Sequence, residues 1–211
     1  NGFRLDGVAT DDQSGRSVSS AGDVNGDGYD DLIIGGIGAD NNGSYSGSSY
    51  VVFGGAADMG ATVNLSDLDG TNGFRLDGES ADDLSGYSVF SAGDINGDGY
   101  DDLIIGAYAA NPNGDSGSSY VVFGSGSAFA ATVDLSTLDG TTGFRLDGEA
   151  DTDTSGFSVS SAGDINGDGY DDLVIGANFA DPNDIFSGSS YVVFGSDMAF
   201  ATTVNLSTLD G

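Results

Sequence analysis

The sequence predicts an all-β protein made of repeated four-stranded sheets, and three observations support that fold class. First, the 211 residues include 37 glycines and only two prolines. Second, every acidic residue except Glu79 and Glu149 is aspartate, which favours turns, whereas helical surfaces favour glutamate. Third, three sequence motifs recur along the chain at a fixed spacing. Together these features are typical of short strands separated by many turns.

The recurring motifs divide the chain into three units that follow one another without a linker. These units cover residues 1–71, 72–141 and 142–211 and form one continuous domain. A fixed period of this length indicates a repeat architecture. The motifs are Gly-Phe-Arg-Leu-Asp-Gly at 2–7, 73–78 and 143–148, Asn-Gly-Asp-Gly-Tyr-Asp-Asp-Leu from Asn25, Asn96 and Asn166, and Ser-Gly-Ser-Ser-Tyr-Val-Val-Phe-Gly from Ser46, Ser116 and Ser187.

Each unit contains four runs of strand length and one shorter run. In the first unit we expect strands at 3–5, 17–21, 32–35 and 48–53, with a short extra strand or turn at 62–65. Four strands in each repeat favour the blade of a β-propeller. Linear β-solenoids usually have shorter coils, and a separate β-sandwich needs about 100 residues. We therefore expect three blades of four antiparallel strands, one in each unit.

Three blades are fewer than the four to eight that propellers typically have. The first strand has no preceding unit and the last unit has no following strand, so two sheet edges are left unpaired, and such edges promote association. We expect a head-to-tail homodimer that closes a six-bladed ring, because a heterologous contact gives either a ring or a filament. A filament of blades and a fragment of a longer array are the alternatives that the sequence leaves open.

The charge and the missing residue types exclude several classes of function. The formal net charge is −30, which argues against nucleic acids and anionic membrane surfaces as partners. The chain has no cysteine and no histidine, which removes disulfides, thiolate metal sites and the commonest general base. No apolar run has the length of a membrane-spanning helix, and no signal peptide is present, so we expect no membrane insertion.

Each unit carries the pattern Asp-x-Asn-x-Asp-Gly-x-x-Asp. Oxygen donors at alternate positions followed by glycine describe a loop around a hard cation, to which the residue after the glycine offers its backbone carbonyl. An all-oxygen donor set favours Ca²⁺ over Zn²⁺ or Cu²⁺, so we expect one Ca²⁺ per repeat and three per chain. The expected ligands are Asp23, Asn25, Asp27, Tyr29, Asp31, Asp94, Asn96, Asp98, Tyr100, Asp102, Asp164, Asn166, Asp168, Tyr170 and Asp172.

The loop differs from an EF-hand in two ways. The twelfth position, where an EF-hand has a bidentate glutamate, is Ile34, Ile105 or Ile175. An apolar strand follows the loop, whereas an EF-hand continues into a helix. We therefore place the expected ion in a turn between two strands, at the edge of a blade. The alternative is a set of Asx-turns in an acidic β-protein that binds no ion.

These motifs resemble FG-GAP repeats, which are the blades of the integrin α-chain propeller and of many bacterial surface proteins. The resemblance rests on residues 14–18, 22–28, 31–35 and 49–53 and their copies in the other units. Tyr108 replaces the proline that follows Gly-Ala in the family pattern, and the phenylalanine before Ser-Gly is absent. The resemblance implies one blade per unit, a structural Ca²⁺ in a strand-connecting loop, and an extracellular or cell-surface role in adhesion or scaffolding.

The remaining residues indicate binding or assembly. Arg4, Arg75 and Arg145 recur at equivalent positions, and we expect each to pair with a nearby aspartate. The recurring tyrosines and phenylalanines of the fourth strand are expected in blade-to-blade packing. The segments 37–45, 108–115 and 178–187 vary most among the units and are candidates for contacts with a protein or glycan ligand.

No nucleophile, base and orienting residue can be assembled from the sequence, so we expect no enzyme activity. The expected function is a calcium-stabilised extracellular β-propeller module for adhesion. A purely structural, self-assembling scaffold is the second candidate, and a hydrolase with a carboxylate pair is a remote third.

Overall fold

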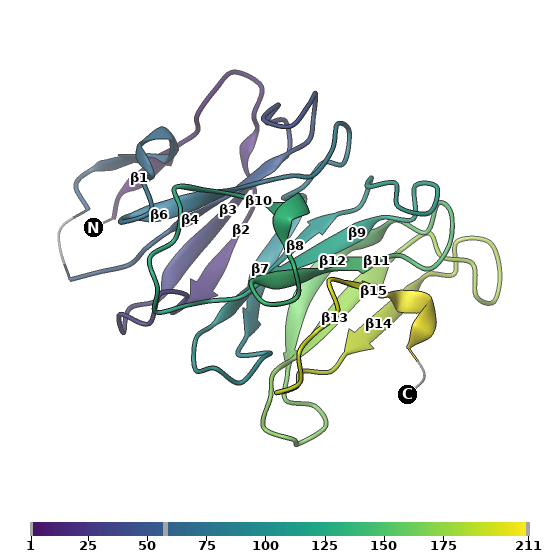
Figure 1. Ribbon diagram of the computed structural model, residues 1–211. Helices are drawn as coiled ribbons and strands as arrows, with labels where there is room; N and C mark the ends of the chain where they lie inside the picture. Colours follow the sequence, from purple (N-terminus) through teal and green to yellow (C-terminus); the bar gives the residue numbers. More distant parts are fainter. Residues whose placement is uncertain (1, 57–58, 210–211) are drawn as a thin grey trace.

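The computed structural model describes residues 2–56 and 59–209, and the described chain is built almost entirely from strands joined by turns (Figure 1). This confirms the all-β fold class. The strands are β1 (Arg4–Asp6), β2 (Ser14–Gly22), β3 (Asp31–Gly36), β4 (Ser48–Val52), β5 (Thr62–Asn64), β6 (Gly73–Asp77), β7 (Ser88–Gly93), β8 (Asp102–Ala107), β9 (Ser118–Val122), β10 (Thr132–Asp134), β11 (Gly143–Asp147), β12 (Ser155–Gly163), β13 (Asp172–Ala177), β14 (Ser189–Val193) and β15 (Thr203–Asn205), and the short 3-10 helices are η1 (Leu65–Asp67), η2 (Leu135–Thr137) and η3 (Leu206–Thr208).

The strands form four sheets, two of which have five strands. The first large sheet has the order β10-β6-β4-β3-β2, and the second has the order β15-β11-β9-β8-β7. Four neighbouring strands in each are antiparallel, as the sequence predicts, and a fifth short strand adds in parallel to the outer one. Within residues 2–56 and 59–209, the third sheet consists of β12-β13-β14, and β1 pairs with β5 alone. The large sheets and the three-stranded sheet lie side by side along the molecule in sequence order (Figure 1).

The sheets cross the boundaries of the sequence units. Each five-stranded sheet combines the three inner strands of one unit with two outer strands of the next, so a blade is not the same stretch of chain as 1–71 or 72–141. The reason is a tight turn before β6, in which the Gly70 amide donates to the Gly73 carbonyl at 2.8 Å. This turn directs the chain back along β4, and Gly73 packs so closely on the Val51 carbonyl that no side chain fits.

The hydrophobic core lies between neighbouring sheets. One cluster joins Ile33, Val51 and Phe74 of the first large sheet to the face of the second, and an equivalent cluster joins the second to the three-stranded sheet. Tyr50 and Tyr120 are buried, which confirms the expected packing role for the first two units. The third copy differs, because Phe194 is exposed at the end of the row of sheets.

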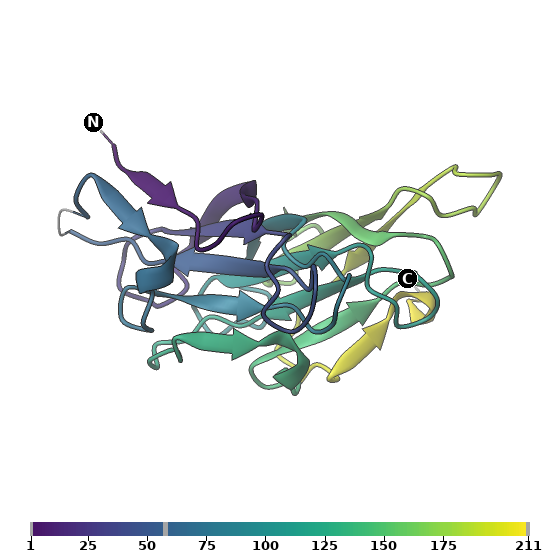
Figure 2. The same ribbon diagram turned by 90° about the horizontal axis from the view of Figure 1, so that it is seen from above.

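The two strands β1 and β14 lie at opposite ends of the molecule (Figure 2). Over the described residues, no helix has the length and apolar character needed to cross a membrane.

Candidate metal centre

The three acidic loops are eight-residue connections at one end of the inner hairpins. Residues 23–30 join β2 to β3, residues 94–101 join β7 to β8, and residues 164–171 join β12 to β13. The structure therefore places the loop between two strands, as the apolar sequence after it predicts. Gly26 and Gly28 have φ angles of 73° and 88°, a left-handed conformation that glycine adopts without a steric penalty.

Side-chain oxygens of each loop point at backbone amides of the same loop. The two carboxylate oxygens of Asp23 accept from the amides of Asp27 and Gly28 at 3.0 and 2.8 Å. The side-chain oxygen of Asn25 also accepts from the Asp27 amide, at 2.9 Å, and Asp27 accepts from the Tyr29 amide at 3.0 Å. The second and third loops repeat these bonds within about 0.2 Å, so the conformation belongs to the motif.

The last aspartate of each motif anchors the loop to the sheet. Asp31 is fully buried, and its carboxylate accepts from the amides of Val24 at 3.0 Å and Gly54 at 2.8 Å. Asp102 and Asp172 make the equivalent pairs of bonds in their sheets. This carboxylate therefore fixes the loop to the start of β3 and to the segment that follows β4.

Burial and neighbouring carboxylates make the anchoring groups Asp31 and Asp102 costly to ionise. Burial raises the pKa of Asp31 to about 6, and the charges of Asp27 and Asp23 add to the increase. Burial likewise raises the pKa of Asp102 to about 8, with Asp98 and Asp94 contributing in the same direction. Hydrogen bonds from backbone amides oppose both increases but do not cancel them. A cation among these groups would remove this electrostatic cost.

The residues fit a hard cation by their chemistry, and their side chains are arranged around backbone amides. Among residues 2–56 and 59–209, no set of three or more carboxylates is gathered closely enough to hold a metal ion. The donor set is nevertheless all oxygen, its aspartates interact electrostatically with the anchoring carboxylate, and the glycines allow the sharp turn. This combination suits a hard cation such as Ca²⁺.

The aspartate that precedes the anchor links neighbouring loops, a role that the sequence did not reveal. The Asp101 carboxylate accepts from the Asp23 amide at 2.7 Å, and the Asp171 carboxylate accepts from the Asp94 amide at 3.0 Å. The second and third loops therefore each contact the loop of the preceding repeat. The signal for this role is the doublet Tyr-Asp-Asp, in which only the second aspartate belongs to the metal motif.

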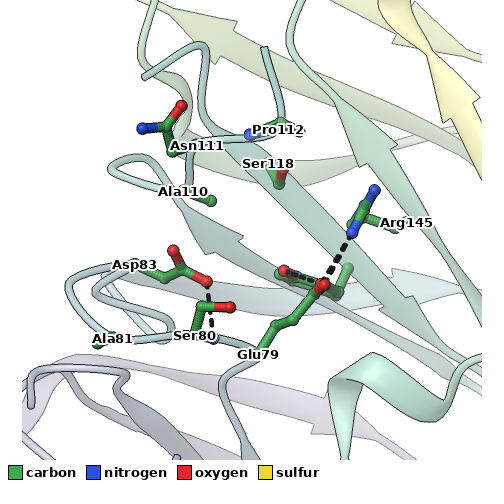
Figure 3. Close-up of a pocket in the computed structure, with 10 residues that line it drawn as sticks. Glu79, Ser80, Ala81, Asp83, Ala110, Asn111, Pro112, Ser118 and Arg145 are labelled. Carbon is green, nitrogen blue, oxygen red and sulfur yellow. Dashed lines mark hydrogen bonds and ion pairs between the residues drawn. The ribbon is translucent and has the colours of Figure 1, made fainter. Parts of the chain in front are cut away.

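A second polar cluster lies where two sheets meet and lines a pocket of about 190 Å³. Figure 3 shows Glu79 and Arg145 pointing toward each other in this pocket. The Tyr120 hydroxyl donates to Glu79 at 2.9 Å, and the Arg145 guanidinium donates to the same carboxylate at 2.9 and 3.1 Å. Arg145 also pairs with Asp147 at 2.8 Å, as Arg75 does with Asp77 at 2.7 Å. The predicted arginine–aspartate pairs are thus present, and the glutamate is an additional partner.

Arg16 is the one arginine that does not recur in the other units, and the structure gives it an aromatic partner. Its guanidinium carbon lies 4.0 Å from the ring centroid of Tyr87, which in turn lies 5.0 Å from the Phe157 ring. These three residues occupy equivalent positions in their units and contact one another because the inner strands β2, β7 and β12 are neighbours. The repeat alignment together with a blade arrangement would have indicated this stack.

The fold and the loops together define a β-propeller repeat protein with integrin-like blades. The sequence profile of the FG-GAP repeat family matches residues 14–52, 85–122 and 155–193, which is more than half of the chain. The chain therefore belongs to the FG-GAP repeat family. Each match covers the three inner strands of one sheet and its acidic loop.

Curated relatives are integrin α-chains. The chain is 30% identical to integrin alpha-PS2 of Drosophila melanogaster over 215 residues, which is 100% of this chain and 14% of that protein. It is 32% identical to integrin alpha pat-2 of Caenorhabditis elegans over 166 residues, covering 77% of this chain and 13% of the relative. It is 34% identical to integrin alpha-6 of Gallus gallus over 122 residues, covering 57% and 10%. The chain thus spans about a seventh or less of the length of these relatives.

Proposed function

We propose that the chain is a calcium-stabilised, non-catalytic β-propeller module for adhesion at a cell surface or in the extracellular space. The observation that carries the proposal is the threefold acidic loop, in which a buried carboxylate lies among other carboxylates and has a raised pKa in the first two copies. The similarity to integrin α-chains supports the adhesive role.

The residues that would hold the ions are the aspartates, the asparagine and the tyrosine carbonyl of each loop. In the first loop they are Asp23, Asn25, Asp27, Tyr29 and Asp31, with the same positions in the other two. A bound Ca²⁺ would supply positive charge beside the carboxylates of the loop. The chain presents oxygen atoms on a sharp turn that glycine allows, and the hydrogen bonds of Asp31 hold that turn against the sheet.

The ligand-binding face is proposed at the other end of the strands. The loops 37–45, 108–115 and 178–187 follow β3, β8 and β13, whereas the acidic loops precede the same strands. The six residues of each strand separate the two ends by about 20 Å. In the third variable loop, Ile185 and Phe186 are exposed and the Phe186 ring lies 5.1 Å from the Phe179 ring. An exposed apolar group on a variable loop suits a protein or glycan ligand.

A purely structural scaffold is the second candidate. In this proposal the chain joins copies of itself head to tail, with the six-bladed homodimer preferred over a filament. A scaffold requires the sheet edges and the metal loops but has no use for the exposed aromatic residues of the variable loops.

A binding experiment separates the two candidates. Glycan and cell-surface binding would be measured with Ca²⁺ and with chelator, using the chain and a variant in which Ile185 and Phe186 are both serine. Adhesion predicts binding that needs Ca²⁺ and is lost in the variant, while the variant keeps the melting temperature of the parent. Binding that is unchanged by chelator and by the variant would exclude the proposed adhesive face.

A further inference from the structure

The first two acidic loops are each held by the unit that follows, at residues that would hold the ion. The carboxylate of Asp101 accepts from the Asp23 amide at 2.7 Å, and the Asp101 amide donates to the Asp23 carbonyl at 3.3 Å. These two bonds close a ring between the first loop and the second. Asp23 begins the acidic motif of the first loop, and Asp101 lies between Tyr100 and Asp102, two expected ligands of the second loop.

Two further contacts join the first loop to the second unit. The Ser125 amide donates to the Val24 carbonyl at 2.9 Å. Ser125 directly follows Gly124, whose amide is bonded to the buried anchoring carboxylate of the second loop. The Tyr100 ring packs against Gly26 so closely that a methyl group at this glycine would overlap it. The position of the first loop therefore depends on the residues that shape the second.

The same contacts recur between the second loop and the third. The Asp171 carboxylate accepts from the Asp94 amide at 3.0 Å, and the Asp171 amide donates to the Asp94 carbonyl at 3.2 Å. The Tyr170 ring covers Gly97 as its counterpart covers the glycine of the first loop. Because the arrangement occurs in two separate pairs of loops, it is a property of the repeat.

The linking carboxylates are partly shielded from water. Asp101 and Asp171 are half-buried, and Val24 and Ile95, which follow the bonded amides, are fully buried. Asp30, at the same position of the first loop, is exposed. Hydrogen bonds to a charged acceptor are stronger than bonds between neutral groups, and burial strengthens them further. The link is therefore a firm one by the standards of a surface loop.

We propose that Asp101 and Asp171 couple neighbouring cation sites, so that filling one acidic loop raises the affinity of the loop before it. They are positioning residues, because each acts on the preceding site through the backbone of Asp23 or Asp94 and is not itself a ligand. The inference rests on the calcium binding proposed above and adds that the sites do not fill independently. By thermodynamic linkage, the coupling acts equally in both directions.

The coupling arises from conformational freedom that two loops share. When the second loop is filled, Tyr100 and Asp102 are fixed on both sides of Asp101. The Asp101 carboxylate is then held at the Asp23 amide, so the backbone of Asp23 loses freedom that filling the first loop must also remove. The second binding event therefore carries a smaller ordering cost than the first, and the result is positive cooperativity.

A double-mutant cycle on the first pair of loops tests the coupling. The Gly28 amide donates to Asp23, and the Gly99 amide makes the same bond in the second loop, so NMR of these two amides reports each site separately during a Ca²⁺ titration of the full chain. Blocking the second site with Asp98→Ala should lower the affinity of the first about fivefold or more. Asp101→Ala should cause a similar loss, and adding Asp98→Ala to it should cause no further loss.

The cycle distinguishes the hydrogen-bonded link from a simple effect of charge. An electrostatic effect of Asp98→Ala on the first site would persist in the Asp101→Ala background, whereas an effect carried by the bond disappears. The matched control is Asp30→Ala, which removes the equivalent carboxylate of the first loop. Within the described residues the Asp30 side chain makes no hydrogen bond, so this variant should leave the affinity of the second site, read at Gly99, almost unchanged.

The second pair of loops gives an independent measurement, which also serves if Asp101→Ala does not fold. Asp171→Ala should lower the affinity of the second site, read at Gly99, by a similar factor. Blocking the third site with Asp168→Ala should have the same effect on Gly99, and the two changes together should not add.

The outcomes separate the coupling from calcium binding itself. If neither glycine amide shifts when Ca²⁺ is added, the proposed calcium function fails and the coupling fails with it. If both sites bind but Asp98→Ala leaves the first site unchanged, the sites are independent. A loss that is equal with and without Asp101 leads to the same conclusion about the link. In these last two cases the coupling through Asp101 is overturned while the calcium-binding function stands.

Discussion

Replacing Asp102 by asparagine should stabilise the protein in chelator and destabilise it in Ca²⁺. The carboxyl of Asp102 has its pKa raised from 3.8 to about 8 by burial and by Asp98 and Asp94. One pKa unit corresponds to about 1.4 kcal/mol, so at neutral pH this group costs the ion-free fold about 4 kcal/mol. Asparagine removes that cost.

The substitution also has a structural penalty. The carboxylate accepts from the amides of Gly124 at 2.8 Å and Ile95 at 3.1 Å, and asparagine can accept only one of these bonds well. Leaving one buried amide unpaired costs about 1–3 kcal/mol. The net gain in unfolding free energy without Ca²⁺ is therefore about 1–3 kcal/mol. Each kcal/mol raises the melting temperature of a chain of this size by roughly 2–4 °C.

With Ca²⁺ the sign reverses, because the variant loses a charged ligand. A site held at about 100 times its dissociation constant contributes roughly 2.7 kcal/mol, and this contribution falls when the ligand is removed. Calorimetric melts of Asp102→Asn and of the control Asp115→Asn, in chelator and in Ca²⁺, measure both effects. Asp115 is exposed and has a φ angle of 54°, which asparagine tolerates, so the control should change little in either buffer. Equal destabilisation of Asp102→Asn in both buffers would refute the electrostatic account of this loop.

Three further predictions concern the described contacts. Burial raises the pKa of Asp83 from 3.8 to about 6, so the stability that this group contributes is fully present below pH 3.8 and is lost as the pH rises through 6. Between pH 7 and pH 4, this group should therefore add about 1–2 kcal/mol to the unfolding free energy of the ion-free protein, as measured by denaturant titration. Gly97→Ala should cost more than about 2 kcal/mol, because its methyl group would overlap the Tyr170 ring, whereas Gly167→Ala has open space and should show only the cost of its left-handed backbone, about 1 kcal/mol. Asp101→Asn should lower the unfolding free energy by about 1–2 kcal/mol and increase hydrogen exchange at the Asp23 amide, from which Asp101 accepts. Unchanged exchange at that amide would show that the bond does not link the two loops in solution.

The local features of this protein could be predicted from its sequence. The strands around Val18, Ile33 and Val51 and the turn at 23–30 follow from short apolar runs, glycine and aspartate. The FG-GAP family follows from the same motifs, because they are contiguous in the chain. The arginine–aspartate pairs could be predicted for a related reason, since Arg75 and Asp77 are two residues apart on one strand and on the same face.

Contacts between repeats could not be predicted in the same way. The bond from the Asp23 amide to Asp101 spans 78 positions, and the ion pair of Arg145 with Glu79 spans 66. Each depends on how far one sheet is displaced from the next, which the periodic sequence does not encode locally. For the same reason, the sequence did not reveal which sheet the opening strand of each unit joins. The hexapeptide Gly-Phe-Arg-Leu-Asp-Gly predicts the same strand whether it pairs within its own unit or with the unit before it.

The sequence by itself determined the kinds of element, their order and the chemistry of the acidic loops, since these depend on backbone preferences and on residues a few positions apart. Only the tertiary structure decided which strands share a sheet, which aspartates link the loops, and which apolar side chains are left uncovered at the two ends. The physical reason is that all three units carry nearly the same motifs, whereas burial depends on the neighbours of each sheet. Phe123 and Phe194 occupy the same position in the repeat, yet one is buried and the other is exposed, because within the described residues only the first has a following strand beside it.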